Sequence, residues 1–155
     1  MAVERWQAGE REVVQHPGAC ALVALTGAGE VVLVQQLREA VRTSLIEIPA
    51  GILDPTDENG AACAARELME ETGYRPTADL EPLGAILTSP GFSDERIELF
   101  VSRGVVPGPR RSEDEGIDVI LMPLSEAVEA VRDGRIIDAK TVAALLLVEA
   151  RAAKA

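Results

Sequence analysis

The sequence predicts an α+β protein, in which a mixed β-sheet is flanked by a few helices. Three observations support this fold class. Segments rich in Val and Leu recur at strand length, and three other segments have a helical composition. The chain has 155 residues, 47% of them hydrophobic, which suits one domain with its own core. We therefore treat residues 1–155 as a single domain built as a layered sandwich of sheet and helices.

The first third of the chain is predicted to be β-structure. Its apolar and β-branched residues fall into short runs separated by turn residues. The expected strands are Glu12–His16, Ala19–Thr26, Val31–Leu37 and Ser44–Ile48. Gly27 and Gly29 favour a hairpin turn between the second and third of these, and Pro49-Ala50-Gly51 is expected to end the fourth.

A helix is predicted over Glu58–Thr72, because Ala, Leu and Met residues give this segment a face of small and apolar side chains. Gly73 follows as a C-terminal cap residue would. Two more strands, Leu83–Thr88 and Ile97–Ser102, are expected around the turn Ser89–Ser93.

The last third is predicted to alternate between a loop, a strand and two helices. Arg103–Glu115 has the composition of a polar loop, and Ile117–Leu121 that of a strand. Ser125 is expected to cap a helix over Glu126–Arg132, and Asp138–Ala153 is expected to form the closing helix.

The formal net charge of −11 argues against a nucleic-acid polymer as partner, because phosphates would be repelled and no Lys/Arg cluster offsets the charge. A small phosphate compound would need cations between itself and the acidic residues. The N-terminus lacks a signal peptide pattern and no apolar run reaches the ~18 residues of a membrane span, so the expectation is a cytoplasmic protein without membrane contact.

The cysteines and the histidine offer little chemistry of their own. Cys20 and Cys63 lie in apolar surroundings without the spacing of a disulfide framework or metal site, so they are interpreted as small core residues. His16 is the single histidine, which nearly excludes a His-based zinc site.

Three glutamates define the most informative feature of the chain. Glu67, Glu70 and Glu71 have the spacing i, i+3, i+4, which places them on one face of the predicted helix. Their mutual repulsion would become coordination around a cation that prefers oxygen ligands, such as Mg²⁺. In an arbitrary acidic helix a solvated face is the more common explanation. Here the opposite face is apolar, a glycine lies at each end, and Arg66 can neutralise and orient the acids, which favours a cation site.

The segment from Gly51 to Tyr74 resembles the Nudix box, which has glycine, five residues, glutamate, seven residues, and then Arg-Glu-aliphatic-x-Glu-Glu-x-Gly-hydrophobic. The tail matches from Arg66-Glu67 to Gly73-Tyr74, and counting back places the first glutamate at Glu58. Six residues rather than five separate Gly51 from Glu58. The extra residue lies in the loop before the helix, where length is tolerated. It leaves either Asp57 or Glu58 in the supporting role, and Glu58 is preferred.

Outside the box, the chain is similar to the ADP-ribose pyrophosphatase branch of Nudix hydrolases over almost its whole length. Pro90 lies sixteen residues after Tyr74, a spacing that marks this branch. The other similar segments are Arg11–Gly18, Gln36–Arg38, Glu47–Gly51, Ser89–Glu95 and Glu113–Ile117. The resemblance implies a Nudix-type α/β/α sandwich with a mixed central sheet and a short N-terminal strand region.

The resemblance also implies a metal site and a base. The main-chain carbonyl of Ala50, Glu67 and Glu71 would hold metal, Glu70 would share ions or bind water, and Glu115 would complete a site once substrate binds. Mg²⁺ is the expected cofactor, with Mn²⁺ or Zn²⁺ as possible substitutes. Glu113 would be the general base, in a loop that closes over the substrate. Viewed alone, acids in a polar loop are more often simply solvated.

The implied substrate contacts come from three other parts of the chain. Arg38 would hold a phosphate, although a surface salt bridge is an equal alternative. Trp6 and Arg11 would reach the adenosine from a neighbouring subunit of a homodimer through segment 1–17; the alternative for Trp6 is a packed or frayed terminal residue. Glu95 would bind the terminal ribose or else be a surface acid. Gly91 and Phe92 would line the site, or with Pro90 only shape the turn.

The function implied is metal-dependent hydrolysis of ADP-ribose to AMP and ribose 5-phosphate. Segment 1–17 is short beside the N-termini of such enzymes, so the expectation is that part of the adenine pocket is missing. Alternatives are another ADP-sugar, a GDP-sugar, NADH or an oxidised nucleotide as substrate. A Nudix domain that binds a nucleotide sugar without cutting it is disfavoured because all box glutamates are present. A purely structural dimer leaves the aligned acids unexplained.

Overall fold

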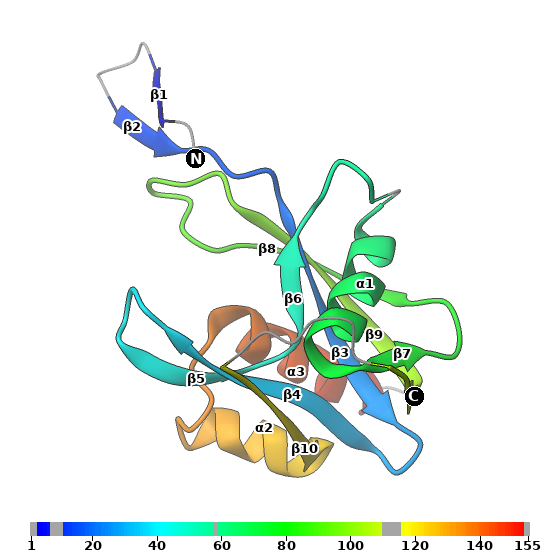
Figure 1. The fold of residues 1–155 in the computed structure, drawn as a ribbon. Helices are drawn as coiled ribbons and strands as arrows, with labels where there is room; N and C mark the ends of the chain where they lie inside the picture. Colours follow the sequence, from blue (N-terminus) through cyan, green and yellow to red (C-terminus); the bar gives the residue numbers. More distant parts are fainter. Residues whose placement is uncertain (1–2, 7–10, 58, 110–115, 154–155) are drawn as a thin grey trace.

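An eight-stranded mixed sheet forms the centre of the protein, and a two-stranded hairpin stands off from it near the N-terminus (Figure 1). The computed structural model describes residues 3–6, 11–57, 59–109 and 116–153. The hairpin pairs β1 (Val3–Trp6) with β2 (Arg11–Val14). The large sheet contains β3 (Ala19–Thr26), β4 (Glu30–Arg38), β5 (Thr43–Glu47), β6 (Ala50–Ile52), β7 (Tyr74–Pro76), β8 (Glu81–Leu87), β9 (Arg96–Pro107) and β10 (Ile117–Pro123).

Strand β3 lies in the middle of the sheet and organises it. The main path runs β10-β4-β3-β9-β7, while β5 pairs with β4, β6 with β3 and β8 with β9. β3 and β9 run parallel, and the other pairs are antiparallel. Every position of β3 before Thr26 is buried, as expected for a strand that is covered on both faces and therefore reads as a continuous apolar run.

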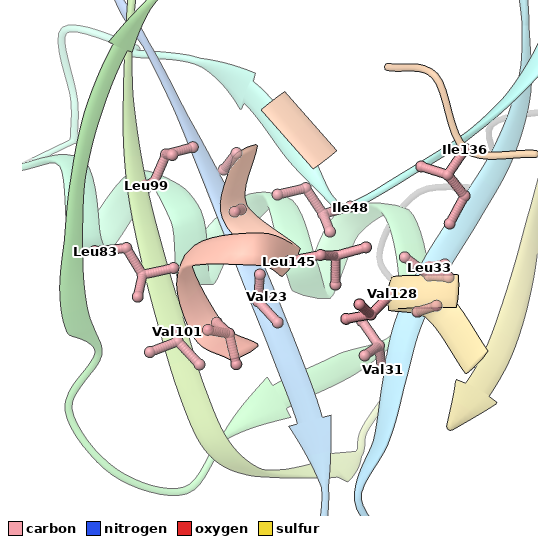
Figure 2. Packing of buried hydrophobic residues seen from close by; sticks show 14 of the residues in the cluster. Val23, Val31, Leu33, Ile48, Leu83, Leu99, Val101, Val128, Ile136 and Leu145 are labelled. Carbon is pink, nitrogen blue, oxygen red and sulfur yellow. The ribbon is translucent and has the colours of Figure 1, made fainter. Parts of the chain in front are cut away.

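Helices cover both faces of the sheet. Cys20 and Leu22 pack in one cluster with the apolar face of α1 (Gly60–Thr72). Ala21 and Val23, their neighbours along β3, pack in a second cluster with residues of α2 (Leu124–Arg132) and α3 (Ala139–Ala152), seen in Figure 2. Since adjacent side chains of a strand point to opposite faces, the two clusters form two core layers. The predicted α/β/α sandwich with a mixed sheet is confirmed.

Several strand boundaries differ from the predicted ones. β2 ends at Val14 rather than His16, and β9 continues to Pro107, so the first residues of the predicted polar loop belong to a strand. β6 and β7 were not expected, and β1 had no predicted bounds within the N-terminal strand region. They are three or four residues long, and their pairing partners β2, β3 and β9 define them more than their own composition does.

The helix starts also differ from the predicted ones. α1 begins at Gly60, and the side chain of Asn59 caps it by accepting from Ala62 N at 2.9 Å. α2 begins directly after β10, so Ser125 lies inside the helix and is not its cap. The Asp138 side chain caps α3 by accepting from Thr141 N at 3.0 Å. No helix in the described ranges is long and apolar enough to cross a membrane.

The interpretation of the cysteines as unpaired core residues is wrong in one respect. Cys20 and Cys63 are both fully buried, but their sulfurs form a disulfide between β3 and α1. The packing of α1 on β3 brings the two Cα atoms to 6.3 Å, within the range that a disulfide can span. Since 43 residues separate the two positions, this proximity is a property of the tertiary fold.

Candidate active site

The short strand β6, which follows β5 closely, brings its main-chain groups against the acidic face of α1. It pairs with the start of β3, where Ala50 lies opposite Ala21 and Gly51 opposite Cys20. The amide of Ala50 donates a hydrogen bond to Oε2 of Glu71 at 3.2 Å. The residue whose carbonyl is the predicted main-chain metal ligand therefore contacts a predicted carboxylate ligand through its amide.

The three glutamates of α1 lie at the edge of this strand. Cys63, Ala64 and Leu68 anchor the other face of the helix in the core. Glu71 is 8% exposed, whereas the side chains of Glu67 and Glu70 are 15% and 32% exposed. The helix thus presents acids in a gradient from the protein interior to the solvent.

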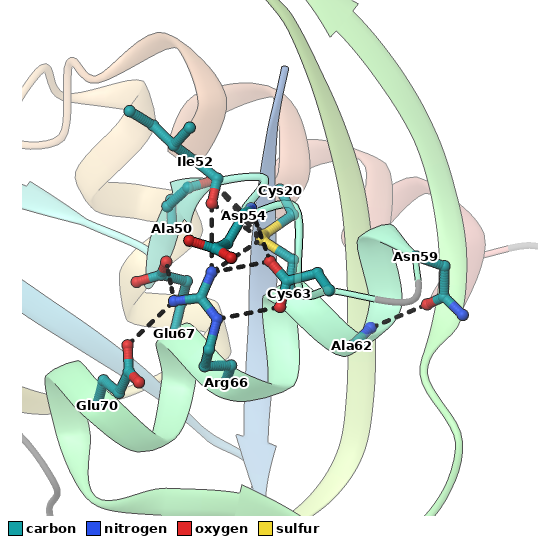
Figure 3. The surroundings of a disulfide bond; sticks show 12 residues. Cys20, Ala50, Ile52, Asp54, Asn59, Ala62, Cys63, Arg66, Glu67 and Glu70 are labelled. Atoms are coloured by element: carbon teal, nitrogen blue, oxygen red, sulfur yellow. Dashed lines mark hydrogen bonds and ion pairs between the residues drawn. A yellow bond between two sulfur atoms is a disulfide. The ribbon is translucent and has the colours of Figure 1, made fainter. Parts of the chain in front are cut away.

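Arg66 holds two of these acids together (Figure 3). Its Nη1 donates to Glu67 at 2.7 Å and to Glu70 at 3.0 Å, and its Nη2 donates to the carbonyl of Ile52 at 3.2 Å. Opposite charges at this range oppose the repulsion between neighbouring carboxylates. Arg66 therefore connects the acidic face of the helix to strand β6.

Asp57 is the acid that supports Arg66 in the structure. Its carboxylate accepts from Nε at 3.1 Å and from Nη2 at 2.9 Å. A two-point contact with a guanidinium fixes its plane. Of the two candidates that the extra loop residue left open, Asp57 therefore makes this contact. Glu58, the preferred candidate, lies outside the described residues, and its supporting role stays a prediction.

Burial controls the ionisation of the two inner glutamates. Burial, together with the smaller effect of the negative charge of Glu67, raises the pKa of Glu71 to about 7, against the opposing effect of the Ala50 hydrogen bond. Burial also raises the pKa of Glu67, although the hydrogen bond and charge of Arg66 act in the other direction. The protein alone thus stabilises the ionised form of Glu71 poorly.

The donor set fits a divalent cation. Glu71 is a buried carboxylate that forms no ion pair with any Lys, Arg or His in the described parts of the chain. Carboxylate and carbonyl oxygens are the ligands that hard cations such as Mg²⁺ prefer. A bound cation would supply the positive charge that compensates the Glu71 carboxylate. Within the described ranges no three acidic, His or Cys side chains already converge as a closed metal cluster; Arg66 neutralises Glu67 and Glu70 instead.

Arg38, Ala50 and Glu95 line one pocket of about 240 Å³ beside this face. Arg38 ends β4, and both its Nε and Nη2 donate to the carboxylate of Glu47, at 2.7 and 2.6 Å. Glu95 accepts from Thr88 Oγ1 at 2.5 Å and lies 3.4 Å from His16 Nε2. The structure therefore brings two predicted substrate-binding residues to the main-chain ligand of the predicted metal site.

Gly91 and Phe92 lie in a different hollow. They line a pocket of about 440 Å³ with Val13 and Leu87, between β2 and the end of β8. The aromatic side chain of Phe92 is 60% exposed. Its backbone carbonyl accepts from Val14 N at 2.8 Å, so this turn also connects the N-terminal hairpin to the sheet.

The remaining predicted residues are placed only in part. The backbones of Trp6 and Arg11 pair across the β1–β2 hairpin. Glu113 and Glu115 fall in the range 110–115, outside the described residues. That range leads into β10, which starts opposite Gln36 on β4, two residues before Arg38.

Sequence reasoning missed two buried charged residues beside the site. Glu47 is 1% exposed and Lys140 is 8% exposed, and their side chains form an ion pair. Glu47 had a signal in the sequence, since it is a charge within the apolar run Leu45–Ile48 and a buried charge requires a partner. Lys140 had none, because it is 93 residues away along the chain.

Comparison with known proteins agrees with this geometry. The model of the NUDIX domain family matches residues 14–145, and the chain belongs to this family. Nudix hydrolases are enzymes that generally use divalent metal ions. A solved structure described as an ADP compounds hydrolase has the same fold, with a TM-score of 0.80 and 23% identity over 94% of this chain and 77% of that one.

Relatives with higher identity define the branch. An ADP-ribose pyrophosphatase of Bacillus subtilis is 39% identical, and a methanol dehydrogenase activator of Bacillus methanolicus is 42% identical; each match spans 90% of this chain and 76% of the relative. A GDP-mannose pyrophosphatase of Cronobacter sakazakii is 41% identical over 84% of this chain and 76% of the relative. Within the family, the chain lies in the ADP-ribose pyrophosphatase-like branch.

Replacing Gly51 with alanine is expected to weaken metal binding without unfolding the protein. An added Cβ would overlap the carboxylate of Glu67, which is the movable end of a side chain and can turn away. If the Glu67 carboxylate turns away from β6, Mn²⁺ affinity should fall about 10- to 100-fold. Mn²⁺ titration followed by electron paramagnetic resonance measures the effect. Gly27→Ala is the control, because a Cβ there meets nothing within 4 Å. Equal Mn²⁺ affinity in both variants would contradict the expectation.

Proposed function

We propose that this protein hydrolyses ADP-ribose to AMP and ribose 5-phosphate with Mg²⁺ as its cofactor. The observation that carries the proposal is the contact between Glu71 and Ala50 beside a pocket that Arg38 lines. An oxygen-rich face for cations thus meets a cationic residue suited to phosphate. Membership of the ADP-ribose pyrophosphatase-like branch supports this substrate over nucleotides that lack a diphosphate link.

The carbonyl of Ala50, Glu67 and Glu71 would hold the metal, with Glu70 sharing an ion or its water and Glu115 joining when substrate is present. Mn²⁺ or Zn²⁺ would be possible substitutes. A bound divalent ion supplies positive charge that polarises the diphosphate and makes a bound water more acidic. Arg66 keeps Glu67 and Glu70 oriented through the contacts described above.

The other proposed roles belong to the protein's own side chains. Glu113 accepts a proton from water as its oxygen bonds to the adenosyl phosphorus, while the bond from this phosphorus to the bridging oxygen breaks. Ribose 5-phosphate leaves with that oxygen. Arg38 holds a phosphate group, and Glu95 binds the terminal ribose. Glu58 supports the box helix.

We also propose that the adenosine contacts come from a homodimer. Trp6 and Arg11 are at opposite positions of the β1–β2 pairing, in a hairpin that projects beyond the large sheet (Figure 1). Such a hairpin can reach a neighbouring subunit, and an indole ring suits stacking on a purine. Gly91 and Phe92, which line the hollow next to β2, complete this part of the site.

GDP-mannose is the second candidate substrate. The similarity to GDP-mannose pyrophosphatases favours it, because the chain is 41% identical to the enzyme of Cronobacter sakazakii and 39% identical to the ADP-ribose pyrophosphatase of Bacillus subtilis. The two reactions share the metal face and differ at the base pocket. A panel of ADP-ribose, other ADP-sugars, GDP-mannose and NADH at fixed Mg²⁺, compared by kcat/KM, separates them.

Hydrolysis of ADP-ribose in ¹⁸O water tests the proposed reaction. Water attack on the adenosyl phosphorus places one ¹⁸O in AMP and none in ribose 5-phosphate, as measured by mass spectrometry of both products. Label in ribose 5-phosphate would reverse the attacked phosphorus. No release of either product, with and without Mg²⁺, would refute the proposed function.

A Glu113→Gln variant is expected to lower kcat about 10²- to 10⁴-fold with little change in KM, because the amide cannot accept the proton but retains the shape of the side chain. Steady-state kinetics with ADP-ribose measure both constants. Asp118→Asn makes the same chemical change at an exposed position of β10 and should leave kcat unaltered. Normal turnover by Glu113→Gln would place the base at another acid.

A further inference from the structure

A buried ion-pair network lies behind Arg38. The carboxylate of Glu47 accepts two hydrogen bonds from Arg38 on one side and contacts Nζ of Lys140 on the other. Burial opposes the ionisation of Glu47, but the Arg38 hydrogen bonds and the charge of Lys140 outweigh it and lower its pKa. A carboxylate that is 1% exposed is therefore kept charged by two cations, of which the side chain of Arg38 is 43% exposed and that of Lys140 only 9%.

The contact with Glu47 leaves one edge of the guanidinium available. Nε and Nη2 of Arg38 are used by Glu47, whereas Nη1 makes no hydrogen bond to any residue that the structure describes. The Arg38 side chain is 43% exposed and lines two adjoining hollows, one with Ala50 and one with Ser89. Because the guanidinium is planar, the position of the Glu47 carboxylate fixes the direction in which Nη1 points.

Lys140 is held in place by the start of α3. Its Nζ lies 3.1 Å from Asp138, the residue that caps the helix. The next residue, Thr141, accepts a hydrogen bond from the amide of Ile48 at 2.9 Å. Two consecutive residues of α3 therefore bind the last residue of β5 and the residue after it, and this junction shortly precedes Ala50.

We propose that Glu47 and Lys140 are positioning residues that aim the free edge of Arg38 at a phosphate group of the substrate. Arg38 touches the ligand, Glu47 sets the plane of its guanidinium, and Lys140 keeps Glu47 in place when Arg38 shares its charge with the phosphate. This inference rests on the proposed function only in that the ligand is a nucleoside diphosphate. It adds α3, which the box motif does not include, to the elements that determine substrate binding.

The requirement for Lys140 follows from the charges. If Arg38 were the sole partner of Glu47, a phosphate and a buried carboxylate would compete for one guanidinium, and the carboxylate would lose part of its compensation. With Lys140 present, Glu47 retains a cation throughout. Arg38 can then bind an anion in the pocket while β5, the strand before Ala50, keeps its position.

A double-mutant cycle on ligand affinity tests this mechanism. The probe is the α,β-methylene analogue of ADP-ribose with Mg²⁺, whose bridging carbon prevents hydrolysis, and its Kd is measured by calorimetry. The variants are Arg38→Ala, Lys140→Met, their combination, and Lys140→Arg. Arg132→Met is the control, because it removes one positive charge from an exposed ion pair with Glu149 on the outer side of the helices.

We expect Lys140→Met to raise Kd about 10-fold and Arg38→Ala about 10- to 100-fold, the range of a charge-assisted hydrogen bond. In the Arg38→Ala background, Lys140→Met should change Kd less than about twofold, because its effect acts through Arg38. Lys140→Arg should restore Kd to within about threefold of wild type, and Arg132→Met should leave it unchanged. A role of Lys140 in stability alone would give the same Kd ratio with and without Arg38.

Equal effects of Lys140→Met in both backgrounds, or none in either, would overturn the proposal. If Lys140→Met does not fold because Glu47 loses a partner, Glu47→Gln/Lys140→Met removes both charges, and an unchanged Kd in that variant would overturn the proposal equally.

Binding and turnover separate the two proposals. A wild-type protein that binds the analogue but does not cut ADP-ribose refutes the proposed function, while the cycle still decides the role of Lys140. A wild-type protein that does not bind the analogue refutes both.

Discussion

A Glu71→Gln variant is expected to lose metal-dependent hydrolysis and, without metal, to be more stable than the wild type at pH 8. The side chain keeps its shape and can still accept the hydrogen bond from Ala50 N. It loses the negative charge that a divalent ion requires. We expect kcat/KM for ADP-ribose to fall at least about 100-fold, as when a group that stabilises charge in the transition state is removed.

The stability gain follows from the raised pKa of Glu71, which burial brings to about 7 from an ordinary value of 4.5. Because the folded state holds the proton more tightly than the unfolded chain, this stabilising contribution is complete below pH 4.5. It is lost as the pH rises through about 7. The full loss is about 3 kcal/mol, because a tenfold difference in proton affinity between the folded and unfolded states corresponds to about 1.4 kcal/mol. The amide does not titrate, so the variant avoids this loss.

Urea unfolding in EDTA from pH 5 to 8 measures the effect, with Glu126→Gln, a change at an exposed acid of α2, as control. Wild type and control should lose stability across this range relative to Glu71→Gln. Mg²⁺ should stabilise the wild type at pH 8 and have little effect on Glu71→Gln. Metal affinity of the wild type should also weaken below about pH 7, because protons compete for Glu71. If the free energy of unfolding depended on pH in the same way for Glu71→Gln and for the control, the raised pKa of Glu71 would be contradicted.

Removal of the disulfide is expected to have the largest effect on stability. Cys20 and Cys63 close a loop with a sequence separation of 43. A cross-link over a loop of this length lowers the entropy of the unfolded chain by an amount worth about 4 kcal/mol at 25 °C. Oxidised wild-type protein should therefore exceed Cys20→Ala/Cys63→Ala in free energy of unfolding by about this amount. Reduced wild type serves as the matched control, because it keeps both side chains and lacks only the bond.

Thiol titration gives the independent measurement. Protein alkylated at the moment of cell lysis and then unfolded in guanidinium should show no free thiols before reduction and two after it. Two free thiols before reduction would contradict the cross-link. The same measurement tests the expectation of a cytoplasmic protein, since reducing compartments seldom keep disulfides. Turnover should persist without the bond, because Arg66 independently connects α1 to β6.

The central strand and the box helix were predictable because local signals coincide with tertiary demands there. Ala19–Thr26 is apolar at nearly every position, and its bounds are the predicted ones because the strand is buried on both faces. The end of α1 at Gly73 was predictable for a local reason as well: this residue has φ 75°, a conformation that glycine adopts easily. The order of the acids on α1 needed only helical periodicity.

The short strands and caps were less predictable. Ala50–Ile52 is extended because β3 offers it a pairing partner, and a three-residue segment has no periodicity to reveal this. Ser125 has the composition of a cap, but β10 runs to Pro123 and the helix starts at the next residue, which places Ser125 within it. Local propensity gave way to the path that the sheet imposes on the chain.

The sequence by itself determined the class of enzyme, through the spacing of the box motif. It also determined that Glu67, Glu70 and Glu71 share one face and that Arg66 lies next to them, since spacing along one helix fixes the relative positions of these residues. Only the tertiary structure decided which groups from other elements meet that face. Asp57 on Arg66, Lys140 on Glu47 and Cys20 on Cys63 are contacts between segments 9, 93 and 43 residues apart. Such contacts depend on how the layers pack, and a single sequence carries no period or spacing that encodes that packing.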